Sequence, residues 1–125
     1  FHPVSNLFIH EIRPVWKETY RVLRRGGTML SGFMQPLMYI FDYEEMNKGN
    51  LIVKHKIPYS DIEVYGMEYL KKEDRPAEFG HSLTDQLGGQ MDAGFAIIGL
   101  YEDHHNDVKI SEYTSTYVAT RAVKL

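Results

Sequence analysis

The first residues in the sequence that could do chemistry are His2, Ser5 and Asn6, which lie in the run HPVSN. This run stands where a buried strand would give way to a loop. In open α/β sheets, ligands bind beyond the carboxyl ends of the strands. The pattern therefore suits a binding site and an ordinary strand-to-loop junction equally well.

The other histidines have plainer alternatives. His81 stands directly before Ser82 and four residues before Asp85, so it suits an active-site lining or an ordinary polar position beside a helix cap. His104 and His105 lie among acidic residues, as the ligands of a metal site might be expected to do. However, adjacent side chains in a loop point apart, and no third ligand follows at a regular spacing. A solvated turn is the simpler interpretation, and we predict no metal site.

Signatures of several other protein classes are absent from the sequence. It contains no G-x-G-x-x-G or G-x-x-x-x-G-K-[ST] phosphate loop, no H-E-x-x-H and no G-x-S-x-G. It has no cysteine, which excludes disulfides and cysteine-ligated zinc. The net charge of −3 argues against a nucleic-acid module, which usually carries a basic surplus. The longest apolar runs, such as 95–100, fall far short of the roughly 20 residues that a membrane span needs.

Two helix-and-strand units must position these side chains. In the first, apolar residues three or four apart predict a helix over about 14–24, with Pro14 in its first turn. A Gly-Gly pair ends this helix, and a buried strand is predicted over 28–34. Helix, glycine stop and buried strand form the second half of a β-α-β crossover, whose first strand would end near Phe1. The chain begins there without Met, so it looks like a processed protein or a part of one.

The second unit lies at the end of the chain. Ser82, with Asp85 three residues on, predicts a capped helix over 82–93 that Gly94 ends. Strands are predicted over 95–102 and 113–123, joined by a polar loop. We predict an α/β fold with a mixed sheet.

The segment between the two units is less regular. Residues 36–50 suggest a short helix or a cap, 51–59 a strand, 60–74 a helix that Gly66 weakens, and 76–81 a short strand pairing with 51–59. His55, between two lysines, is expected at the surface or half-buried. The methionines and aromatic residues of 33–43 follow the end of a strand, where they could form an apolar lid over a substrate.

The run WKETYRVLRRGGTMLSGF, residues 16–33, resembles the helix and following strand of class I S-adenosylmethionine-dependent methyltransferases, a Rossmann-like family. These proteins commonly have E-x-x-R-V-L-(K/R)-P-G-G before an apolar strand, and here Arg25 stands where proline is usual. HSLTDQLGGQMDAGFAIIGLYED, residues 81–103, is similar to the segment before the sixth strand of bacterial type-11-like members. The helix and the last two strands match the family's C-terminal helix and its antiparallel sixth and seventh strands.

The resemblance implies that the chain, one unit over 1–125 with a substrate-cap insertion at about 36–81, is the C-terminal half of such an enzyme. It implies S-adenosylmethionine as the cofactor of the full-length parent, although the glycine-rich cofactor loop is not in this sequence. The residues expected to border the cofactor are His2, Pro3, Val4, Ser5 and Asn6. Those expected to contact the methyl acceptor are Phe33, Met34, Met38, Tyr39, Tyr43, Ser82 and Gln86. His2 and His81 are the candidate general bases.

The function expected of the parent is methyl transfer to a small-molecule acceptor, with this chain inactive alone and the missing N-terminal half as its partner. We expect a cytoplasmic protein with no nucleic-acid or membrane partner. The uncovered edge of strand 28–34 would recruit a partner, so a homo-oligomer is expected. The main alternative is a free-standing α+β binding or oligomerisation module that uses the face around 37–43. A weaker one is a metal-dependent hydrolase that uses the histidines.

Overall fold

The computed structural model describes residues 5–125, and its first long element is the helix α1 (Arg13–Val22). Pro14 lies in the first turn, where a missing N–H breaks no helical hydrogen bond. The helix ends two residues before its predicted end, because Leu23 is already extended. Lys124 Nζ donates to two of the last carbonyl oxygens of α1, at 2.7 and 2.8 Å. Gly26, at φ +77°, then turns the chain and donates its N–H to the Lys124 carbonyl.

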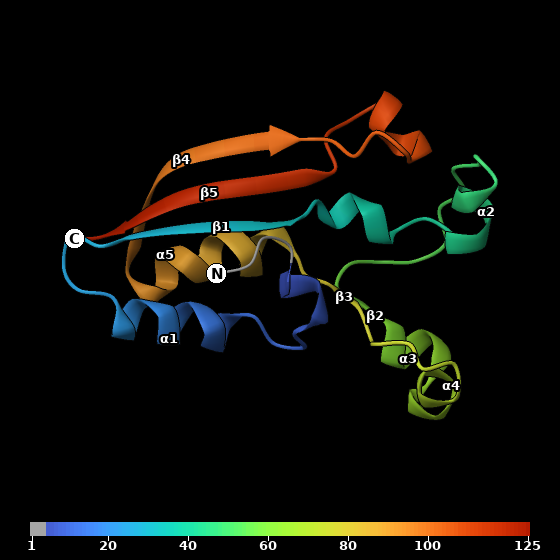
Figure 1. The fold of residues 1–125 in the computed structure, drawn as a ribbon, viewed down its shortest axis with the longest axis horizontal. Coiled ribbons are helices and arrows are strands. Elements are labelled where there is room, and N and C mark those ends of the chain that lie inside the picture. Colours follow the sequence, from blue (N-terminus) through green and yellow to red (C-terminus); the bar gives the residue numbers. More distant parts are fainter. Residues whose placement is uncertain (1–4) are drawn as a thin grey trace.

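Three strands form the main sheet in the order β1 (Thr28–Met34), β5 (Tyr117–Lys124), β4 (Phe95–Asp103). β5 lies in the middle and is antiparallel to both neighbours, with Thr120 opposite Ser31 on β1. The bounds of β1 are those predicted, and β4 extends one residue beyond its predicted end. The fold is thus a mixed α/β arrangement with an antiparallel sheet and flanking helices (Figure 1).

The final strand starts at Tyr117, four residues later than predicted. Residues 113–116 follow the 3-10 turn η4 (Lys109–Glu112) and form a loop instead of extended chain. The Thr116 N–H donates to the Asp103 carbonyl, which closes the loop before β5 begins. The predicted start was wrong because threonine and tyrosine favour strands but also tolerate such a loop.

The two helices of the main units lie on one face of the sheet (Figure 1). The predicted helix over 82–93 is one continuous helix whose first half is a π-helical turn, η3 (Thr84–Gly88), followed by α5 (Gly89–Ala93). A Cβ on Gly89 would lie 2.7 Å from the Trp16 ring, so this glycine lets α5 approach α1 closely. The core between helices and sheet consists of Ile12, Trp16, Met29, Phe95 and Ala122. We call α1, α5 with η3, and the three strands the sheet body.

The opposite face of the sheet is open in the described structure. Leu30 on β1 is 66% exposed, and Tyr101 on β4 is 58% exposed on the same face. Within residues 5–125, β1 pairs only with β5, so its other edge is free of ladder hydrogen bonds. No helix in the described part of the chain combines the length and apolarity needed to cross a bilayer.

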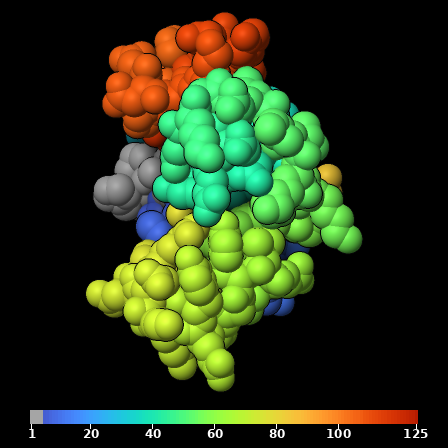
Figure 2. Space-filling view, turned by 90° about the vertical axis from the view of Figure 1, so that its right-hand side faces the viewer, coloured from blue at the N-terminus to red at the C-terminus, as the bar shows by residue number. Residues whose placement is uncertain are grey.

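Residues 36–81, which we call the cap segment, project from the carboxyl end of β1 (Figure 1). In Figure 2 they cover much of the face that turns toward the viewer, next to the loop after β4. The elements are all short: η2 (Pro36–Tyr39), α2 (Tyr43–Asn47), β2 (Tyr59–Ser60), α3 (Asp61–Tyr65), α4 (Met67–Lys72) and β3 (Phe79–Gly80). Before the sheet body lies one further turn, η1 (Ser5–Phe8).

Two predictions for the cap segment were wrong. The strand over 51–59 shrinks to β2 and one isolated bridge between Phe41 and Val53, because Ile52 and Val53 face solvent and no strand runs beside them. β2 does pair antiparallel with β3, so the predicted pairing partner is right although the strands are only two residues long. The helix over 60–74 is split at Gly66, whose φ of +83° ends α3 and precedes α4.

Candidate functional site

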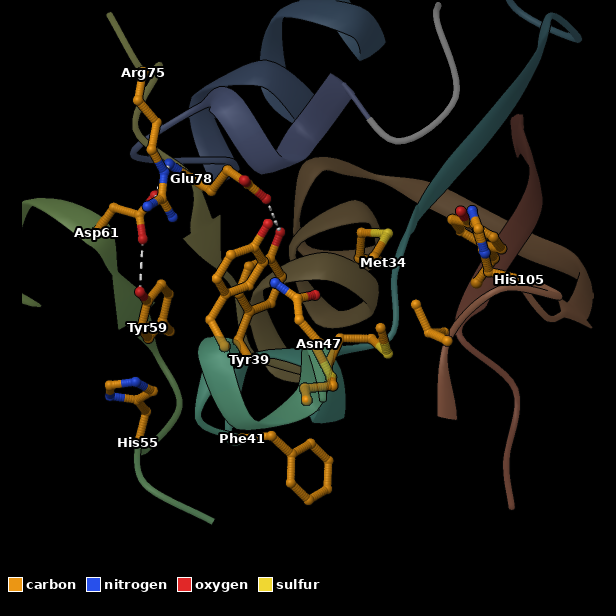
Figure 3. Close-up of a pocket in the computed structure, with 15 residues that line it drawn as sticks. Met34, Tyr39, Phe41, Asn47, His55, Tyr59, Asp61, Arg75, Glu78 and His105 are labelled. Carbon is orange, nitrogen blue, oxygen red and sulfur yellow. Dashed lines mark hydrogen bonds and ion pairs between the residues drawn. The ribbon is translucent and has the colours of Figure 1, made fainter. Parts of the chain in front are cut away.

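A cavity of about 370 Å³ lies where the carboxyl end of β1 meets the cap segment (Figure 3). Its apolar wall comes from β1, η2, α2 and the loop after β4, and carries Met34, Met38, Phe41, Met46 and Val108. Its polar wall comes from the stretch around β2 and from the residues just before β3. Pockets of this size and position commonly bind small molecules in α/β proteins.

Asp61 organises the polar wall. Its side chain is 2% exposed, and Oδ1 accepts the hydroxyl of Tyr59 at 2.6 Å. Oδ2 accepts the Glu78 N–H at 2.9 Å and lies 3.7 Å from Arg75 Nη2. The position follows from the local sequence: the Ser60 side chain caps α3 by accepting the Glu63 N–H, which places Asp61 in the first helical turn. A buried carboxylate is tolerated only with such partners.

Two tyrosines lie against each other beside this carboxylate. The rings of Tyr39 and Tyr59 are stacked with centroids 5.4 Å apart, and the Tyr39 hydroxyl donates to Glu78 Oε1 at 3.0 Å. Burial raises the pKa of Tyr39 strongly, and the charge and hydrogen bond of Glu78 raise it further. Burial, and then the hydrogen bond to Asp61, likewise raise the pKa of Tyr59. Both hydroxyls therefore stay neutral donors over the physiological range.

Arg75 is held among aromatic rings. Its guanidinium carbon lies 4.9 Å from the centroid of Tyr65 and 5.5 Å from that of Tyr43. Together with the contact to Asp61, these ring faces fix the cation at the edge of the cavity. His55 lies on the other side of Tyr59, with ring centroids 5.0 Å apart. The polar wall thus combines three charged groups with several ring faces.

The loop after β4 brings a histidine to the opposite wall. His105 lines the cavity, its N–H donates to Thr116 Oγ1 at 2.7 Å, and its Nδ1 accepts the Asp107 N–H at 3.1 Å. Its neighbour His104 is exposed, as the predicted solvated turn requires. Across residues 5–125 no three His, Cys, Asp or Glu side chains gather closely enough to hold a metal ion.

Asn6, one of the residues predicted near the cofactor, lies in a second place, a buried polar network under the sheet. Asn6 is fully buried in η1, and its Nδ2 donates to Gln86 Oε1 at 3.2 Å. His81 is 7% exposed, with Nε2 3.1 Å from the Asn6 carbonyl oxygen. Gln90 Nε2 donates to the Gln86 carbonyl, and Gln90 Oε1 accepts the hydroxyl of Thr120 on β5. These bonds tie η1 and β3 to the sheet body.

One atom of this network lacks a partner. Among the residues that the structure describes, Asn6 Oδ1 is buried and accepts no hydrogen bond. An unpaired buried acceptor is costly, so it marks a place where a donor from outside these residues would fit. The other predicted cofactor neighbours, His2, Pro3 and Val4, lie outside the described residues, and Ser5 stands beside Asn6 in η1.

The residues predicted to contact an acceptor divide into two sets. Phe33 is 0% exposed inside the body, Ser82 accepts the Asp85 N–H as a helix cap, and Gln86 belongs to the buried network. The structure brings none of these three to the cavity wall. The other four line the cavity: Met34, Met38, Tyr39 and Tyr43.

Sequence reasoning missed most of the polar wall. Asp61, Arg75 and Glu78 were not singled out, and His105 was predicted in a solvated turn. His55 was predicted at the surface or half-buried, and it is half-buried. Asp61 and Glu78 are 17 residues apart and meet only through the β2–β3 pair, which leaves no spacing signal. The usable signal was the Ser60 cap, because a capped first turn fixes the place of the residue after it.

The known proteins to which this chain is similar are methyltransferases. No family model matches the chain. The chain is 49% identical over 127 residues to YbaJ of Bacillus subtilis (strain 168), a protein named as an uncharacterized methyltransferase. The match covers 99% of the chain and 49% of YbaJ, so the chain spans about half the length of the curated relative that it matches.

Two solved structures have the same fold. One is a putative S-adenosylmethionine-dependent methyltransferase from Listeria monocytogenes, with a TM-score of 0.66, 11% identity, and coverage of 98% of this chain and 59% of that one. The other is an S-adenosylmethionine-dependent methyltransferase from Mesorhizobium loti, with a TM-score of 0.65, 12% identity, and coverage of 97% and 58%.

Proposed function

Since the chain has the fold of the C-terminal half of S-adenosylmethionine-dependent methyltransferases, we propose that it is the acceptor-binding half of such an enzyme. The carrying observation is the 49% identity to a methyltransferase along 99% of the chain. The cavity at the carboxyl end of β1 supports the proposal, because this is where an α/β fold holds its ligands. In this proposal the cap segment covers a small-molecule acceptor and excludes water from it.

The residues of this chain do not form a site for S-adenosylmethionine by themselves. The sequence has no glycine-rich loop that could approach a nucleotide, and the described residues offer one orphaned polar atom, Asn6 Oδ1. We therefore propose that an N-terminal half supplies the cofactor site and that the chain alone is inactive. Asn6, with Ser5 beside it, would then lie at the border between the halves.

The roles of individual residues follow from their places. Met34, Met38, Tyr39 and Tyr43 are proposed to contact the acceptor, because all four line the cavity. His81 is a poorer general base than the sequence suggested, because it is buried and its Nε2 already lies at the Asn6 carbonyl. His2 stays a prediction outside the described residues.

The test begins with the DNA upstream of the codon for Phe1. We expect a continuous reading frame that encodes a glycine-rich loop. The protein of that longer frame should bind S-adenosylmethionine in calorimetry and release S-adenosylhomocysteine with an acceptor, whereas the 125-residue chain should do neither. Micromolar cofactor binding by the 125-residue chain would contradict the proposed division between the halves. A frame that starts at or just before Phe1 would favour the free-standing binding module.

The open sheet face bears on assembly. Leu30 and Tyr101 are exposed on one side of the sheet, and β1 has a free edge within the described residues. Exposed edges and apolar faces recruit partners, so we propose that the 125-residue chain self-associates. Light scattering that shows a monomer at high concentration would rule this out. A cytoplasmic location stays a prediction.

A further inference from the structure

The polar wall of the cavity carries an excess of negative charge, because two carboxylates, Asp61 and Glu78, face one guanidinium, Arg75. The charges of Asp61 and Arg75 compensate each other, with Oδ2 and Nη2 3.7 Å apart. Both oxygens of Asp61 also accept hydrogen bonds, from Tyr59 and from the Glu78 N–H. Because Asp61 is 2% exposed and each of its oxygens already has a partner, it offers almost no surface to a ligand.

Glu78 is the charge that remains. Its Oε1 accepts the Tyr39 hydroxyl, and within residues 5–125 no hydrogen bond or ion pair reaches its other carboxylate oxygen. Figure 3 shows Glu78 and the Tyr39 hydroxyl meeting at the inner end of the polar wall. A carboxylate can accept about four hydrogen bonds, so Glu78 can take further donors from a ligand.

Arg75 does not make the cavity an anion site. Its guanidinium lies against the rings of Tyr43 and Tyr65 and faces Asp61, so its charge is already compensated. The other basic side chains on the wall are two histidines. One of them, His105, already accepts the Asp107 N–H on its Nδ1.

The rest of the wall suits the carbon skeleton of a small ligand. Four thioether and aromatic side chains, Met34, Met38, Phe41 and Met46, supply apolar contact. The ring of Tyr39 is stacked on Tyr59, and only its hydroxyl edge meets the Glu78 carboxylate. One cavity thus combines a negative charge and an apolar wall.

We propose that this cavity binds an amine, with its ammonium group on the free Glu78 oxygen and its apolar part toward the methionines. The inference rests on the proposed function in one respect: the bound amine is then the class of molecule that accepts the methyl group. The binding itself depends only on residues of this chain.

The test uses three probes with the same phenylalkyl skeleton but different charge: phenethylamine, phenethyl alcohol and phenylacetate. Each is titrated into the isotope-labelled chain, and amide and methyl shifts in NMR report both affinity and place. We expect phenethylamine to bind with shifts at the cavity residues, about tenfold or more tightly than the alcohol, because charged hydrogen bonds exceed neutral ones. Phenylacetate should bind most weakly.

The variant Glu78→Gln removes the charge but keeps an oxygen for the Tyr39 hydroxyl. Phenethylamine should lose about tenfold or more in affinity for this variant, while the affinity of phenethyl alcohol stays unchanged. Glu73→Gln is the matched control, because Glu73 is exposed at the end of α4 and lies outside the cavity. Its affinity for the amine should equal that of the unmodified chain, and both variants should unfold at the same temperature as that chain.

The inference is overturned if the alcohol or phenylacetate binds as tightly as the amine, if Glu78→Gln leaves amine binding unchanged, or if no probe binds the cavity. None of these outcomes touches the methyltransferase proposal, which is decided by cofactor binding and S-adenosylhomocysteine release in the longer frame. Failure there with amine binding intact would leave the cavity as an amine site of a non-catalytic protein.

Discussion

The sheet body and the cap segment are stabilised in different ways. The body has strands of seven to nine residues, and its core residues Trp16, Met29 and Phe95 are at most 4% exposed. In the cap no element exceeds six residues, and a buried carboxylate with its partners lies at the centre of its polar wall. A unit with long hydrogen-bonded strands and an apolar core unfolds cooperatively as a whole. Short elements joined by a few polar contacts open locally. The body therefore carries the fold, and the cap can change its shape around a ligand.

The largest effect is expected in the body. Trp16→Ala removes a side chain that is 0% exposed and donates to the Asp85 carbonyl, so it should lower the free energy of unfolding by about 3–5 kcal/mol. Urea unfolding monitored by circular dichroism gives this value. Lys17→Ala, an exposed position on the same helix, is the control and should change it little. If Trp16→Ala melted only the cap, the body would not be the unit that carries the fold.

A change at Asp61 should instead destabilise the cap and leave the body unaffected. Asp61→Asn keeps the volume but leaves one acceptor oxygen for the two donors, Tyr59 and the Glu78 N–H. We expect a loss of about 1.5–3 kcal/mol, confined to the cap. Hydrogen exchange should rise at the amides of β2, α3 and β3 and stay unchanged in β5. An equal rise in β5 would show that cap and body unfold together.

The same contrast explains what could be predicted from the sequence. β1 has its predicted bounds because a glycine pair before it and Pro36 after it delimit an apolar run. The alternation over 51–59 predicted a strand, but alternation forms a strand only beside an extended partner, and Val53 meets Phe41 in a single isolated bridge. Local patterns determine long elements with a buried face, and they say little about short elements fixed by contacts far apart in sequence.

The candidate site divides along the same line. Met34 and Met38 line the cavity as expected, since residues that follow a buried strand stay near its carboxyl end. Glu78 was missed because its neighbours Asp61 and Tyr39 are 17 and 39 residues away, and no spacing connects them. The apolar half of the cavity was therefore predictable, and the charged half needed the tertiary structure.

Substitutions at two adjacent glycines, Gly88 and Gly89, can test how closely α5 packs against α1. A Cβ on Gly89 would lie 2.7 Å from the Trp16 ring, so Gly89→Ala should cost about 1–3 kcal/mol. Gly88 has an ordinary helical backbone, and its Cβ would approach nothing closer than 3.8 Å. Gly88→Ala should therefore stabilise the protein by about 0.4–1 kcal/mol. Urea unfolding of each variant shows whether its free energy of unfolding falls or rises. Equal effects would mean that α5 does not lie against α1 as described.

The smallest effect is a pH dependence that belongs to the cap alone. Burial, and then Glu78, raise the pKa of Tyr39 above the value of about 10 that a tyrosine has in the unfolded chain. The neutral hydroxyl therefore stabilises the cap fully below about pH 10, and this stabilisation is lost as the pH rises above that value toward the folded-state pKa. At about pH 11, opening of the cap should increase by up to about tenfold.

Tyr39→Phe separates this effect from general alkaline unfolding. Tyrosinate absorbance measured against pH should lose part of its late-titrating component in the variant, because burial raises the pKa of Tyr39, and Tyr59, whose pKa is also raised, keeps the rest. Near-ultraviolet circular dichroism of the unmodified chain should change over the same pH interval, while far-ultraviolet dichroism, which reports the sheet of the body, stays constant. If both signals changed together, the cap would not be an independently opening unit. The amine site would then be as rigid as the sheet, and a ligand would have to enter without moving the cap.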